Sequence, residues 1–168
     1  FFLPSAPETL LSGRVKVQGP LENLVHRFRL QWDASLLDGK ATAHYKGPSS
    51  TGFSASARFE QIRPEKFPVF PQKNLKGQLN GRFEIEAADL RSASPRTKLR
   101  FDLTDSNLHG FSAEKASIRA ATDGRDLMIR KLSASAPWGR LKSEGRVRRF
   151  FQPEARSFSI RAQTRNLD

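Results

Sequence analysis

Hydrophobic and polar residues alternate one by one along most of this chain. Between residues 75 and 87 every second position holds Leu, Gly, Phe, Ile or Ala, and polar residues such as Asn80, Arg82 and Glu84 lie between them. Successive side chains of a β-strand point to opposite faces, so this pattern predicts a strand with one apolar and one polar face. Similar alternation recurs about ten times, in residues 11–17, 28–34, 37–45, 53–59, 75–87, 99–103, 116–120, 127–129, 132–138 and 158–162.

Short clusters of Gly, Pro, Asp and Ser lie between or at the ends of these runs, and they predict turns. They are Gly19-Pro20, Asp38-Gly39 and residues 47–50, 123–126 and 137–139. Asp123-Gly124 is typical of a tight hairpin. The pattern therefore predicts a meander of antiparallel strands. A proline-rich loop at 63–71 and a shorter break at 92–95 interrupt it.

Glycine recurs on the apolar side of the predicted strands. A Leu-x-Gly unit occurs at residues 11–13, 37–39, 75–77 and 108–110. Glycine there leaves room for a neighbouring large side chain and lets a sheet bend sharply. We therefore expect an all-β fold, a long antiparallel meander curled like a taco into a partly open barrel or trough with a hydrophobic interior.

Three segments, 10–21, 36–41 and 74–83, resemble the AsmA-like proteins, particularly their TamB-type members. The resemblance is a general similarity of sequence pattern, without a diagnostic motif, that extends over nearly the whole chain. It implies a sheet folded lengthwise into an open trough, within a periplasmic parent protein anchored in the inner membrane. It also implies movement of lipids, or assembly of outer-membrane proteins, across the bacterial envelope, with no catalytic residues. We accordingly expect residues 1–168 to be a single β domain from a larger protein.

The apolar face has two interpretations. It either packs into a closed core such as a sandwich, or it lines a hydrophobic groove for phospholipid transport between the inner and outer membranes. Long strands and the lack of an amphipathic helix that could cover the face favour the groove. The residues expected to line it are Leu11, Val15, Val17, Phe28, Leu30, Trp32, Tyr45, Phe53, Phe59, Leu79, Phe83, Ile85, Phe101, Leu103, Ile118, Leu127, Ile129, Leu132 and Trp138.

A structural function is the alternative to lipid transport. A β-scaffold without lipid in its core could bind outer-membrane protein clients by adding a strand to its edge. A sheet taken from a longer one has free edges, so we also expect edge-strand self-association. An outer-membrane protein assembly factor is the protein partner that this alternative predicts.

The chain carries a net charge of +12, which indicates an anionic partner. Candidates are a phospholipid surface, an acidic polymer or nucleic acid. Most Lys and Arg residues lie at alternate positions, on the polar faces of the predicted strands, and the aromatic residues lie on the opposite faces. Single-stranded nucleic acid is bound by aromatic and basic side chains together. Nucleic acid is therefore not the partner we expect.

Candidate chemistry is sparse. The chain has no cysteine, and His26, His44 and His109 are far apart without metal-ligand spacing. Glu84 and Glu86 share the polar face of one predicted strand with Arg82, as on an ordinary solvated surface. No nucleophile elbow or phosphate-binding glycine loop is present in the sequence. We expect neither enzymatic activity nor a metal or cofactor.

Overall fold

A computed structural model describes residues 11–45, 47, 51–66, 76–90, 92–137 and 139–165. Their alternating segments form ten strands and two short 3-10 turns. The strands are β1 (Leu11–Gln18), β2 (Asn23–Trp32), β3 (Ser35–Tyr45), β4 (Thr51–Ile62), β5 (Gly77–Ala88), β6 (Arg96–Leu108), β7 (Phe111–Asp123), β8 (Leu127–Ala136), β9 (Gly139–Arg148) and β10 (Ser157–Arg165). The 3-10 turns are η1 (Pro64–Lys66) and η2 (Pro153–Ala155).

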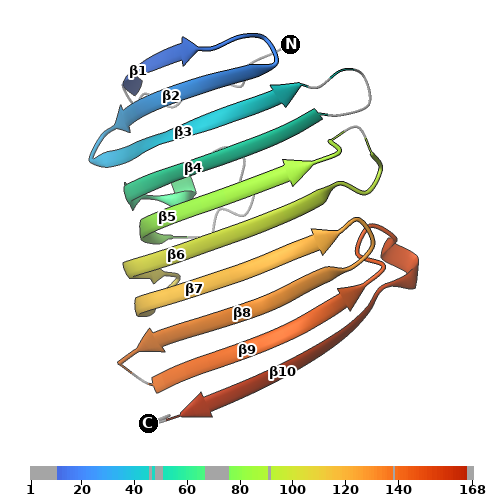
Figure 1. The fold of residues 1–168 in the computed structure, drawn as a ribbon. Coiled ribbons are helices and arrows are strands. Elements are labelled where there is room, and N and C mark those ends of the chain that lie inside the picture. Colours follow the sequence, from blue (N-terminus) through green and yellow to red (C-terminus); the bar gives the residue numbers. More distant parts are fainter. Residues whose placement is uncertain are drawn as a thin grey trace.

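The strands form one sheet in sequence order, and each pairs antiparallel with the next (Figure 1). β1 and β10 lie at opposite edges and do not pair with each other, so the sheet is not closed into a barrel. The longest strands, β6 and β7, have 13 residues each, which corresponds to about 43 Å. The predicted all-β meander, curled into a partly open trough, is confirmed.

The turn predicted at Asp38-Gly39 is wrong, because both residues lie inside β3. Asp38 pairs with Arg29 and Arg58, and Gly39 pairs with Phe28 and Ala57. A Cβ atom on Gly39 would lie 2.3 Å from the backbone oxygen of Ser56. Glycine is therefore needed here for a close approach of two strands, and the alternation around it outweighs the local Asp-Gly signal.

Other predicted turns do separate strands. Gly19-Pro20 lies between β1 and β2, and Asp123 begins the turn from β7 to β8. The proline-rich break falls between β4 and β5, where residues 64–66 form η1. Residues 67–71 of that break lie outside the described residues.

Register places most apolar residues of the ten strands on one face. Directly paired residues of antiparallel strands point to the same side, and the pairing can be followed from strand to strand. One such row crosses the whole sheet: Val15, Phe28, Gly39, Ala57, Phe83, Phe101, Ile118, Leu132, Ser143 and Ala162.

At several places the alternation of apolar and polar residues changes phase by one residue. Four register shifts at these places keep the face apolar. They lie between β4 and β5, β5 and β6, β7 and β8, and β8 and β9. In β8 the shift brings both Ile129 and Leu132, an odd and an even position, onto the apolar face. Such bulges insert one residue without reversing the rest of the strand.

The described residues form a single layer without a closed core. Among them the only buried hydrophobic residues are Ala55, Ala57, Phe59 and Ala136. No large side chain in this part of the chain has less than 2% of its surface exposed. The sandwich interpretation of the apolar face is therefore wrong for the described strands, because no second layer packs on them.

Candidate functional site

The apolar face is the first candidate site. Every residue predicted to line the groove lies on it, except Trp138, which is outside the described residues. Those on the face are Leu11, Val15, Val17, Phe28, Leu30, Trp32, Tyr45, Phe53, Phe59, Leu79, Phe83, Ile85, Phe101, Leu103, Ile118, Leu127, Ile129 and Leu132. The sheet therefore brings together side chains that are more than 100 positions apart in the chain.

Exposure along this face increases toward the sheet edges. Phe59 in β4 is only 5% exposed, but Val15 in edge strand β1 is 59% exposed and Phe158 in edge strand β10 is 77% exposed. Isolated exposed hydrophobic residues are ordinary, but a continuous apolar face of this length is typical of binding surfaces.

Phe59 and Phe101 stack across an intervening strand. Their ring centroids are 5.5 Å apart, although Phe59 is in β4 and Phe101 in β6. The residue of β5 that pairs with Phe59 is Gly81. Because Gly81 has no side chain, the two rings meet above it. Glycine on the apolar face thus makes room for a large neighbour, as the sequence pattern predicted.

Several residues of this face were not predicted to line the groove. Leu37, Leu99, Phe158 and Ile160 are in phase with the predicted alternation, so the pattern alone could have identified them. Phe111 pairs with Leu108 on the same face. Its phase differs from that of Ala116 and Ile118 in the same strand, so alternation counted from those residues misses it.

The opposite face is polar, and across β5 and β6 its charges are balanced. Arg82 and Arg100 donate hydrogen bonds to Asp102 at 3.1 and 2.8 Å, and Lys98 pairs with Glu86 at 3.3 Å. Partial burial raises the pKa of Asp102. Hydrogen bonds from Ser117, Arg82 and Arg100, with the charge of Arg100, outweigh that effect and hold this pKa below its ordinary value.

Two further carboxylates organise the sheet end near η2. The Asp126 side chain accepts hydrogen bonds from the Arg149 backbone N–H and from Arg146 Nε, both at 2.9 Å. These contacts lower the pKa of Asp126, with the bond from the Arg149 backbone as the largest cause. Backbone N–H groups of Asp126 and Arg125 similarly lower the pKa of Asp123. Both carboxylates therefore fix the backbone of the turns they contact.

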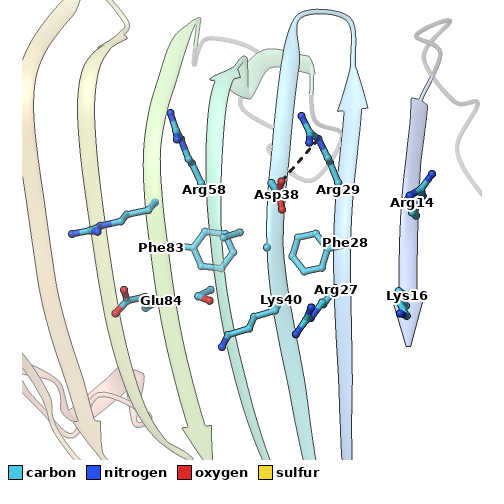
Figure 2. A pocket seen from close by; sticks show the side chains of 14 residues that line it. Arg14, Lys16, Arg27, Phe28, Arg29, Asp38, Lys40, Arg58, Phe83 and Glu84 are labelled. Atoms are coloured by element: carbon cyan, nitrogen blue, oxygen red, sulfur yellow. Dashed lines mark ion pairs between the residues drawn. The ribbon is translucent and has the colours of Figure 1, made fainter. Parts of the chain in front are cut away.

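A shallow hollow of about 650 Å³ extends over β1 to β5 and is the second candidate site (Figure 2). Two cross-strand rows of polar-face residues form its walls. One row is Arg14, Arg29, Asp38, Arg58 and Arg82, and the other is Lys16, Arg27, Lys40, Ser56 and Glu84.

The hollow opens on the polar face. Its remaining lining residues, Phe28, Gly39, Ala57 and Phe83, are those that lie between the two rows on their strands. Apolar-face neighbours such as Leu37 and Ile85 do not line it. The hollow and the apolar face are therefore on opposite sides of the same strands.

The described residues contain no cluster of His, Asp or Glu that could hold a metal ion. None of their helical segments is long and apolar enough to cross a membrane. No protein-family model matches the chain, and no curated protein or solved structure matches it significantly. The candidate function accordingly rests on the geometry of the two faces.

Proposed function

We propose that this chain is a periplasmic domain of an inner-membrane-anchored envelope protein and that it carries phospholipid along its apolar face. The observation that supports the proposal is the continuous apolar face over ten strands, most of whose large side chains remain partly exposed. Transport between the inner and outer membranes, in support of outer-membrane assembly, is the process that such a groove serves.

Acyl chains supply the chemistry that fits this face. Burial of a lipid chain contributes about 0.8 kcal/mol per CH₂ group. On the described apolar face the rows consist of aliphatic and aromatic side chains with Gly, Ala and a few hydroxyl or His side chains, without Lys, Arg, Asp or Glu. A wall without charged anchors lets a lipid slide along the groove, which transport requires and tight storage does not.

Native mass spectrometry of the chain after exposure to bacterial phospholipid tests the proposal. Phe83→Arg places a charge in the middle of the apolar face and should abolish the bound-lipid peaks. The matched control, Gln163→Arg, adds the same side chain to the exposed polar face of β10 and should retain them. If lipid is absent from the unsubstituted chain, or is retained by Phe83→Arg with the β-sheet intact by circular dichroism, the lipid groove is wrong.

A structural scaffold that binds protein clients is the second candidate function. The observation in its favour is that the outer sides of both edge strands, β1 and β10, are unpaired among the described residues. Unpaired edges can accept an added strand from an unfolded outer-membrane protein. Backbone amide protection on β1 or β10 in the presence of a client peptide, without bound lipid, would favour this function.

A further inference from the structure

The polar face does not pair its charges evenly. Among the described residues, most ion pairs lie on β4 to β6 or near η2, as in Arg82–Asp102 and Arg146–Asp126. On β1 to β3 the only one is Arg29–Asp38, at 3.9 Å with both side chains more than half exposed. The charge balance seen in the centre of the sheet is therefore lost toward its β1 edge.

Three cations lie directly opposite one another on these strands. Lys16 pairs with Arg27, and Arg27 pairs with Lys40, so the three form a cross-strand row that we call the cationic ladder. Arg14 pairs with Arg29 beside it. Like charges placed directly opposite on a sheet are destabilising.

The cationic ladder has no counter-charge among the described residues. Neither its members nor Arg14 make an ion pair or a side-chain hydrogen bond there, and all four are exposed. The hollow that contains them is lined by seven Lys or Arg residues and two Asp or Glu residues, a difference of +5. An arrangement that opposes folding and faces solvent is readily explained by an anion bound from outside.

We propose that the cationic ladder docks the polar face of β1 to β4 on a bilayer surface rich in anionic phospholipid. The side chains come from adjacent strands of one sheet and project to one side, so they can reach several headgroup phosphates at once (Figure 2). The proposal goes beyond lipid carriage, because docking uses the face opposite to the groove.

Other anionic partners fit this face less well. The aromatic residues of the described strands lie on the apolar face, so the ladder has no stacking platform for bases of single-stranded nucleic acid. A small anion would be poorly enclosed, because the hollow is shallow and open along its length. A surface of many phosphates matches both the spread of the cations and the openness of the hollow.

Flotation of the full chain with vesicles tests the docking surface. Vesicles of phosphatidylcholine containing phosphatidylglycerol should bind the chain at low salt, and binding should weaken as salt is added. Each cation near an anionic surface contributes about fivefold in affinity. The variant Lys16→Gln/Arg27→Gln/Lys40→Gln should therefore bind about a hundredfold more weakly.

A matched control removes the same charge elsewhere. Arg96→Gln/Lys98→Gln/Arg161→Gln takes three cations from exposed ion pairs with Asp89, Glu86 and Glu144 on the same face. These cations are already neutralised by their partners, so this variant should bind the vesicles almost as well as the unsubstituted chain.

Three results would overturn the proposal. Equal losses in the two variants would mean that net charge alone drives binding. A lack of binding to the phosphatidylglycerol vesicles at low salt would mean that the ladder only protects the free β1 edge from association. Tighter binding of a single-stranded oligonucleotide than of vesicles would indicate a nucleic-acid partner. Ile118→Asn changes the apolar face outside the hollow and adds no charge. It should weaken lipid retention in native mass spectrometry and leave this flotation unchanged, so the two proposals fail separately.

Discussion

At the scale of single residues, glycines decide how closely neighbouring strands approach. A Cβ atom on Gly39 would lie 2.3 Å from a backbone oxygen of β4, and one on Gly81 would lie 2.1 Å from the Asp102 backbone oxygen in β6. Backbone cannot move aside as a flexible side chain can. These positions therefore require glycine because of the space available, and the sheet takes its shape partly from them.

Gly39→Ala should destabilise the chain, because its methyl group meets β4. Overpacking of this kind costs about 1–3 kcal/mol in the free energy of unfolding. The control is Gly52→Ala in β4, where the nearest atom to an added Cβ lies 3.4 Å away. That variant should be neutral or stabilising. Urea unfolding of both variants is the measurement, and equal effects would contradict the close-approach argument.

At the scale of strands, cross-strand pairs determine how charge affects stability. In β5 and β6 cations face carboxylates, and Arg100 donates a 2.8 Å hydrogen bond to Asp102. In β1 to β3, by contrast, Arg27 has Lys16 on one side and Lys40 on the other. A cationic side chain thus stabilises the pairing of β5 with β6 and destabilises the pairing of β1, β2 and β3.

Arg27→Glu should stabilise the sheet, because it converts two like-charge pairs into two opposite-charge pairs. Each such pair contributes about 0.2–1 kcal/mol on a sheet. Arg100→Glu makes the same change of charge next to Asp102 and should lower the melting temperature. Thermal unfolding by circular dichroism distinguishes them, and a loss of stability in Arg27→Glu would show that the ladder is not strained by repulsion.

At the scale of the whole molecule, stability depends on one sheet rather than on a core. Few described side chains are buried, so backbone pairing, cross-strand contacts and turn-fixing carboxylates have a larger share in stability than in a two-layer domain. Asp102, Asp123 and Asp126 all have pKa values below the ordinary 3.8. Acid conditions therefore affect several parts of the sheet together.

The chain should lose stability as pH falls below about 4. With a pKa lowered by folding, each of these carboxylates binds a proton more readily in the unfolded state. Their stabilisation is complete above the ordinary pKa and is lost as pH falls through the folded value. Urea unfolding across this pH range is the measurement, and Asp102→Asn should flatten the curve. An unchanged curve would mean that the Asp102 contacts do not favour its ionised form.

Alternation along the chain was sufficient to predict the fold class, the strands and the apolar face, because a period of two directly reports which side of a strand a residue occupies. It was also sufficient to group Phe28, Phe83 and Ile118 on one face before any pairing was known. Local signals were weaker, and Asp38-Gly39 was predicted as a turn although it lies inside β3.

Only the tertiary structure decided the matters that depend on register. Which cations face each other across β1, β2 and β3, and where bulges return Ile129 and Leu132 to the same face, follow from the pairing of distant segments. The choice between a closed core and an open sheet likewise required the strand order. A one-dimensional pattern states the face of each residue but not its neighbours, and both candidate sites are built from neighbours.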